Sequence, residues 1–154
     1  MPDIVHRLTL QALPETVLAA ITTSRGVRSW WTRDADIGPR RAEFRFPQYG
    51  EAAVATAQVA VDTSAGRVSW AIDRCFHDDW LGTRIEFDLR ALEGQTVVAF
   101  AHRGFAAETE HFAVCSTGWA YYLVSLKRYL ELGQGLPAPD HDFVTLFTPA
   151  LASA

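Results

Sequence analysis

Cysteine is scarce in this chain, whose 154 residues contain only Cys75 and Cys115. The two form no CxxC pair, and no cysteine–histidine spacing around them matches a zinc site. One disulfide between them is the alternative arrangement, but a chain of this length buries a sufficient core without one. We therefore expect two unpaired thiols, as in a protein of a reducing compartment, and no bound metal or other cofactor.

Long apolar runs and basic clusters are also missing. The N-terminal stretch MPDIVHRL has neither the basic nor the apolar region of a signal peptide. The most apolar run, near residues 96–101, is far too short to span a bilayer. The net charge is −4, and no basic patch of the kind that binds nucleic acid is present. The sequence predicts a soluble, cytoplasmic protein with no membrane span and no nucleic-acid partner.

The short motifs of common catalytic sites are absent as well. The sequence has no GxSxG, no phosphate-binding loop and no HExxH. Enzymatic activity would therefore depend on acid–base chemistry by a histidine, tyrosine or arginine in a cavity. Whether the protein is an enzyme stays open at this point.

Apolar periodicity, by contrast, runs through most of the chain. Hydrophobic residues make up 49% and charged residues 21%, the balance of one globular domain. Alternation of apolar and polar residues predicts strands at 3–11, 42–47, 52–62, 67–75, 83–92 and 96–105. In the clearest of these, Ile85 and Phe87 share one face, while Arg84 and Glu86 share the other. SAG at 64–66 and EGQ at 93–95 predict turns.

Helical spacing predicts two short helices, at 13–23 and 24–32, and a long helix from about 108 to 132. Ser24 is expected to cap the second helix and Gly133 to end the long one. Sequential strands joined by short turns imply an antiparallel sheet. One face of that sheet must be covered, and of the predicted helices only the long one can cross it. The predicted fold class is therefore α+β.

Four segments together resemble one known family. LPETVLAAITTSRGVRSWW (13–31) is similar to its helix pair, RVSWAI (67–72) to one strand, GTRIEFDLRALEGQTVVAFAHRGF (82–105) to its hairpin, and STGWAYYLVSLKRYLELGQG (116–135) to its final helix. The family is the START-like (SRPBCC) superfamily, in the branch named for the activator of a heat-shock chaperone's ATPase, the AHSA-type domain.

The resemblance implies a helix-grip fold, in which a curved antiparallel sheet of about six to seven strands wraps a long C-terminal helix. Two short helices follow the first strand. This assigns residues 1–135 to the domain and leaves 136–154 as a C-terminal tail. The tail is apolar at Phe143, Leu146 and Phe147, which suggests docking onto the domain or pairing of two protomers as a homodimer.

The resemblance also implies a cavity between sheet and helix, because members of the wider superfamily bind lipids, hormones and polyketides. Inward-facing residues are expected to line it, although each also fits a role in the core: Trp30, Trp70, Ile72, Phe87, Phe100, His102, Trp119, Tyr122 and Leu123. This set predicts binding of a small hydrophobic or amphipathic ligand. Two alternatives stay open: a cyclase- or aromatase-like enzyme using the same cavity, and a chaperone-activator-like interaction module.

Several single residues have competing interpretations. His102 is either a polar anchor for the ligand or a structural histidine bonded to a backbone carbonyl or to the Trp30 segment. Trp30 is predicted to face inward and Trp31 to lie at the rim, since neighbours on a helix point about 100° apart. HDDW at 77–80 hints at metal binding, but its position favours a solvated turn. ETEH at 108–111 is interpreted as the acidic start of the long helix.

Overall fold

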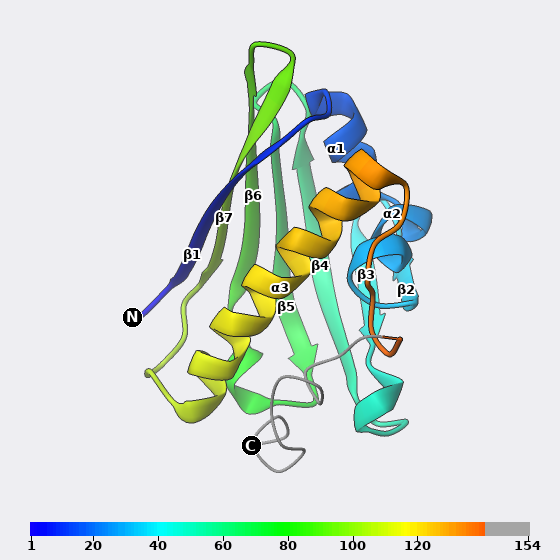
Figure 1. Ribbon diagram of the computed structural model, residues 1–154. Coiled ribbons are helices and arrows are strands. Elements are labelled where there is room, and N and C mark those ends of the chain that lie inside the picture. The colour runs from blue at the N-terminus through cyan, green and yellow to red at the C-terminus, as the bar shows by residue number, and fades with distance from the viewer. Residues whose placement is uncertain (141–154) are drawn as a thin grey trace.

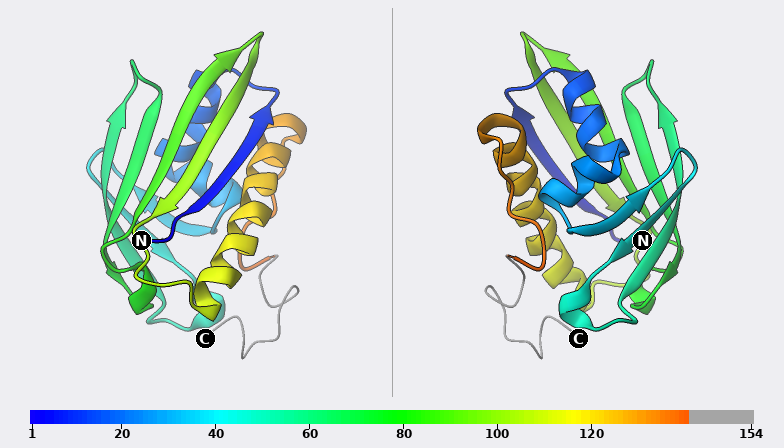
Figure 2. Two further views of the ribbon diagram at one scale, coloured as in Figure 1. Left: turned by 90° about the vertical axis from the view of Figure 1, so that its left-hand side faces the viewer. Right: turned by 90° about the vertical axis from the view of Figure 1, so that its right-hand side faces the viewer.

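The structure, a computed structural model, describes residues 1–140 of the chain. In that range, seven strands form one antiparallel sheet that curls around a long helix (Figures 1 and 2). The elements in chain order are β1 (Ile4–Leu10), α1 (Pro14–Thr22), α2 (Ser24–Trp30), β2 (Asp34–Ile37), β3 (Arg41–Arg45), the 3-10 turn η1 (Pro47–Tyr49), β4 (Val54–Asp62), β5 (Arg67–Cys75), the 3-10 turn η2 (Asp78–Trp80), β6 (Arg84–Leu92), β7 (Gln95–Arg103) and α3 (Glu110–Leu132). The predicted α+β helix-grip fold is confirmed.

The strand order is β1-β7-β6-β5-β4-β3-β2, so the first strand lies beside the last. Leu10 of β1 pairs with Thr96 of β7, while β2 forms the opposite edge. The sequence did not predict β2, because its four residues include two aspartates and are too few to show alternation. A register shift in β4 between Thr56 and Ala57 adds to the curl of the sheet.

Alternation along the strands separates a buried concave face from a solvated convex face. In β6, Ile85, Phe87 and Leu89 are buried, as predicted. On the convex face, Glu86 accepts hydrogen bonds from Arg84 at 2.6 Å and from Arg103 at 2.8 Å. The β6–β7 turn has positive φ at both central residues, Glu93 (51°) and Gly94 (80°), which is the geometry of a tight two-residue hairpin.

The α1–α2 corner is closely packed. Thr23, not the predicted Ser24, caps α2, because its Oγ1 accepts from the Gly26 backbone N–H at 3.0 Å. Ser24 instead accepts from the Ile37 N–H at 2.8 Å, which joins α2 to β2. A Cβ on Gly26 would lie 2.6 Å from Cα of Ala20. The two helices can therefore approach this closely only with glycine at residue 26.

Helix α3 crosses the concave face of the sheet diagonally (Figure 1). Its start is capped by Thr109 and its end by Gly133 at φ 83°, so the predicted end is confirmed and the start lies two residues later. Leu136 N–H donates to Ser125 Oγ at 2.7 Å, and Ala138 N–H donates to the Trp31 carbonyl at 2.8 Å. The beginning of the predicted tail is thus bound to the domain.

The apolar residues Phe143, Leu146 and Phe147, predicted to dock the tail or pair protomers, lie outside the described residues. Within residues 1–140, no helix is both long enough and apolar enough to cross a membrane.

Candidate functional site

A cavity of about 230 Å³ lies between α3 and the sheet, at the end of the molecule where α3 begins. This is the lower end in Figure 1, where η1 and η2 turn beneath the sheet. The lining is largely aromatic and comes from four parts of the chain: Trp31 after α2; Phe46, Gln48 and Tyr49 around η1; Cys75, Phe76, His77 and Trp80 around η2; and His111, Val114, Cys115, Trp119 and Tyr122 of α3.

Trp31 forms the inner wall of this cavity. Its ring stacks on that of Trp70, with centroids 5.6 Å apart and planes 4° apart, and lies 4.9 Å from the ring of Trp119. Trp31 is 3% exposed, so the prediction that it lies at the rim is wrong. The error has a physical cause: α2 ends at Trp30, and Trp31, which follows it, is enclosed by the rings of Phe44, Trp70 and Trp119.

Trp30 is not among the lining residues, although its ring stacks on that of Trp31 with centroids 6.1 Å apart. Its indole N–H donates to the Ala20 carbonyl at 2.9 Å, and its own carbonyl accepts from Ser125 Oγ at 2.8 Å. The side chain is fully buried. Trp30 therefore fixes α2 against α1 and α3 and does not line the cavity.

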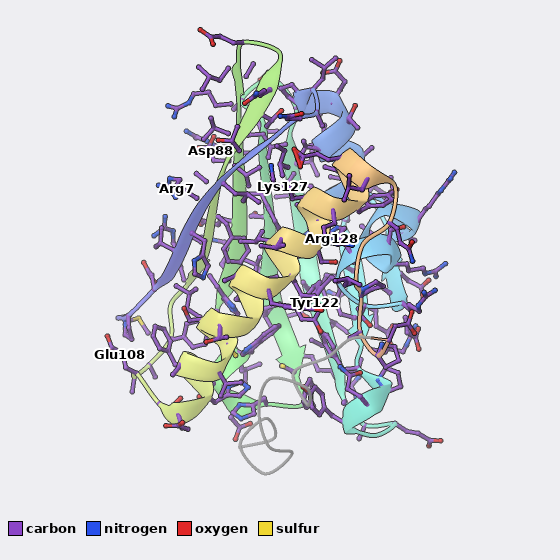
Figure 3. The ribbon with its side chains drawn as sticks, viewed as in Figure 1. Arg7, Asp88, Glu108, Tyr122, Lys127 and Arg128 are labelled. Carbon is purple, nitrogen blue, oxygen red and sulfur yellow. The ribbon has the colours of Figure 1, made fainter. Side chains whose placement is uncertain are left out.

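Two of the nine residues predicted to contact a ligand line the cavity, Trp119 and Tyr122; Tyr122 is labelled beside α3 in Figure 3. The other seven face the concave side as predicted, but they fill the core: Trp30, Trp70, Ile72, Phe87, Phe100, His102 and Leu123. The discrepancy arises because most of the space between sheet and helix is packed with side chains. The cavity is at the end where α3 begins, and alternation along a strand does not reveal at which end such a space lies.

His102 is held in the core by both ring nitrogens. Nδ1 accepts from Trp119 Nε1 at 3.0 Å. Nε2 lies 2.7 Å from Thr83 Oγ1, whose own proton goes to the Trp80 carbonyl. The imidazole is therefore neutral with its proton on Nε2, and burial lowers its pKa to about 3. These partners differ from the backbone carbonyl or Trp30 segment considered from the sequence.

Both cysteines are free, as predicted, and both line the cavity. Burial raises the pKa of the Cys115 thiol to about 12 and also raises that of Cys75. Cys115 Sγ accepts from Trp80 Nε1 at 3.3 Å. At neutral pH both side chains are protonated thiols, which are poor nucleophiles.

The mouth of the cavity carries a polar group formed by His77, Asp79 and His111, here called the mouth cluster. The two imidazole rings stack with centroids 3.3 Å apart. Asp79 Oδ2 lies 3.5 Å from His111 Nδ1 and accepts from Thr109 Oγ1 at 2.6 Å. Burial and the neighbouring His77 lower the pKa of His111 to about 4, so His111 is neutral at pH 7.

Sequence reasoning missed several lining residues because they lie in turns without periodicity. Gln48 and Tyr49 belong to η1, and Phe76 precedes η2. Phe46 was predicted to lie on a strand but was not assigned to the cavity. The available signal was the high density of aromatic residues in RFPQY and CFHDDW. That density shows the presence of large side chains but not their convergence.

The fold and its cavity define the class: a START-like helix-grip domain with an apolar cavity at the start of its long helix. The family described as Activator of Hsp90 ATPase homolog 1-like protein matches residues 11–131. The chain belongs to this family, as its sequence motifs suggested.

Solved structures of other proteins share this fold. The Aha1 dimer of Colwellia psychrerythraea is 34% identical, with a TM-score of 0.77, over 88% of this chain and 100% of that one. An AHSA1-like protein of Aeromonas hydrophila is 19% identical, with a TM-score of 0.66, over 86% and 94%. The di-domain ARO/CYC BexL of the BE-7585A biosynthetic pathway is 16% identical, with a TM-score of 0.69, over 86% and 47%. The last two show the fold alone. A comparison with curated proteins found no match.

Proposed function

We propose that the protein binds a small amphipathic molecule with a flat apolar part in the cavity beside α3. The observation that carries this proposal is the aromatic wall formed by Trp31, Trp80 and Trp119, whose rings lie within 6.3 Å of one another. Small-molecule sites are usually apolar and concave with a few polar groups. The volume of about 230 Å³ lies below the usual ~300–1,000 Å³ and favours a ligand smaller than a typical drug.

The polar part of the ligand has a candidate partner in Gln48. Its side-chain oxygen is buried and has no hydrogen-bond partner among residues 1–140. A buried acceptor without a partner costs about 1–3 kcal/mol, which a ligand hydroxyl or amine would recover. We therefore assign Gln48 as the polar contact, in place of the His102 anchor expected from the sequence, because both His102 nitrogens are already bonded.

Binding is favoured over catalysis because the lining groups are held in unreactive forms. Cys75 and Cys115 are protonated thiols, and burial keeps the ring of His111 neutral with a low pKa. A cyclase- or aromatase-like reaction on the bound molecule is the alternative outcome. It is distinguished by incubating the protein with each ligand and determining the mass of the recovered compound.

The test uses tryptophan fluorescence during titration with small aromatic acids and alcohols, after a thermal-shift screen of the same compounds. Phe76 lies at the opening and is 45% exposed, whereas Leu92 is 51% exposed at the far hairpin. Phe76→Ala is expected to weaken binding about tenfold, and Leu92→Ala, the matched control, should leave it unchanged. Val114→Phe should reduce the cavity and abolish binding. Equal affinities in all four proteins would overturn the proposal.

A second candidate, an interaction module of the Aha1 type that forms a homodimer, is supported by the 34% identity to the Colwellia Aha1 dimer. Light scattering after size-exclusion chromatography tests the dimer directly. A molecular mass of one chain across a hundredfold range of concentration would exclude a stable dimer.

A further inference from the structure

We propose that the mouth cluster of His77, Asp79 and His111 binds one divalent transition-metal ion, with Zn²⁺ as the reference ion. One ligand atom from each residue lies within 4.8 Å of the other two. Two imidazoles and one carboxylate are a common set of protein ligands for zinc. His77 and His111 also line the cavity, but the contacts proposed for the organic ligand are the tryptophan rings and Gln48, so metal binding does not require that ligand.

The cluster joins two parts of the chain that are distant in sequence. His77 caps η2, Asp79 lies in it, and His111 lies in the first turn of α3. His77 Nδ1 accepts from the Asp79 backbone N–H at 3.3 Å, which ties the His77 ring to the backbone of η2. The fixed start of α3 then brings His111 against them, with its ring 3.3 Å from that of His77.

The carboxylate has the outer support typical of a metal ligand. Thr109, the residue that caps α3, donates its hydroxyl to Asp79 Oδ2 at 2.6 Å. Partners of this kind orient ligating groups and commonly account for a factor of 10–100 in metal affinity. The same hydroxyl accepts from the Phe112 N–H at 3.1 Å, so the carboxylate is positioned by the helix start itself.

Coordination requires the three side chains to rearrange, because the two imidazole rings are stacked nearly parallel, with an interplanar angle of 8°. Ligand atoms around a tetrahedral zinc ion lie about 3.3 Å apart, since each is about 2.0–2.2 Å from the metal. The atoms of the mouth cluster therefore move closer, and the two stacked rings tilt toward each other. All three side chains are partly exposed, which leaves them room to turn.

Three protein ligands leave a fourth coordination position open, as in zinc sites that bind a further molecule. His77 and His111 both line the cavity, so the open position lies at its mouth. A metal ion there would present a Lewis acid to any carboxylate, hydroxyl or thiol that enters.

The test measures binding of Zn²⁺ alone to the tag-free protein by titration calorimetry, with Co²⁺ as a spectroscopic replacement. The variants are His77→Gln, His111→Gln and Asp79→Asn. His6→Gln is the matched control, because His6 is also partly buried, lies on β1 and bonds Ser116 instead. Circular dichroism confirms folding of each variant. If a histidine variant fails to fold, Asp79→Asn still tests the site, because asparagine has nearly the same size and shape as aspartate.

One zinc ion should bind per chain, and each cluster variant should lose at least about tenfold in affinity, whereas His6→Gln should match the wild type. The Co²⁺ complex should show d–d bands without a sulfur-to-metal charge-transfer band. Equal affinity in the wild type and all three cluster variants would overturn the proposal. A charge-transfer band would also overturn it, because the ligands would then include Cys75 or Cys115. Zinc binding does not depend on the organic ligand, so each proposal can fail alone.

Discussion

Trp119 donates its indole N–H to His102 Nδ1 at 3.0 Å, and this bond joins the middle of α3 to β7 inside the core. The other ring nitrogen of His102 is bonded to Thr83, next to β6. The His102 side chain thus links β7 both to α3 and to the residue that precedes β6. This geometry gives His102 a structural role.

Replacing His102 with alanine should destabilise the fold by about 2–4 kcal/mol. The change leaves a void in the core and deprives the buried Trp119 N–H of its acceptor, and each effect is costly. Urea unfolding at pH 7 measures the difference. His6→Ala, at a partly exposed site with one hydrogen bond, should cost less than about 1 kcal/mol. A His102→Ala protein as stable as the wild type would refute the structural role.

Acidification should destabilise the protein in a window set by His102. Its folded pKa of about 3 lies below the ordinary value of 6.5, so the unfolded chain binds the proton first as pH falls. Stability is therefore complete above pH 6.5, decreases as pH falls toward 3, and is reduced by about 2–3 kcal/mol at pH 4.5. His111, with a pKa of about 4, acts in the same direction.

The measurement is a set of urea unfolding curves between pH 7.5 and 4.5. The His102→Ala variant should show a shallower pH dependence than the wild type, because one of the two depressed histidines is gone. Identical slopes in the two proteins would contradict the assignment. Asp73 and Glu86 have pKa values lowered by arginine neighbours. Their contribution to the free energy of unfolding is lost mainly below pH 4.5, outside the range of these curves.

Trp31→Ala should cost about 3–5 kcal/mol, the usual loss for a large buried aromatic side chain. A residue at the rim would cost less than about 1 kcal/mol, so the experiment separates the structure from the sequence-based prediction. Leu13→Ala, at a half-exposed position before α1, is the control for a surface change. Chemical denaturation of the three proteins gives the comparison.

Gly26→Ala should destabilise the protein, although alanine is the better helix former by about 1 kcal/mol. The new Cβ would lie 2.6 Å from Cα and the carbonyl oxygen of Ala20, so α1 and α2 would have to separate. A net loss of about 2 kcal/mol or more is expected from this overpacking. Arg25→Ala on the exposed side of α2 should be neutral or slightly stabilising. A stabilised Gly26→Ala protein would show that the corner is looser than described.

The sequence predicted the parts of the fold that follow from periodicity. The prediction failed where the orientation of a side chain depends on packing between elements. Ile85 and Phe87 alternate with charged residues, so their inward orientation follows from the pleat of the strand. The interior position of Trp31 depends on its contacts with Phe44 of β3, Trp70 of β5 and Trp119 of α3, all of which come later in the chain. No pattern within RSWWT contains that information.

The site was harder to predict than the fold for the same reason. HDDW and ETEH are each weak signals, interpreted from the sequence as a solvated turn and an acidic helix start. Glu110 does lie in the first turn of α3, but His111 of the same motif faces His77. The contact between these two histidines depends on the angle at which α3 packs against the sheet. Spacing along the chain predicts contacts within an element, whereas this contact joins two elements.

The pairing of β1 with β7 also determines when the sheet can be completed. Ile4 pairs with His102 and Leu10 with Thr96, so the strand that precedes all the others finds its partner only after β7 has been synthesised. Pairings between such distant residues slow folding, because a large loop must close before any contact forms. Until then the apolar face of β1 is unpartnered on the ribosome, and delay or stalling within β6 or β7 would leave an open strand available for aggregation.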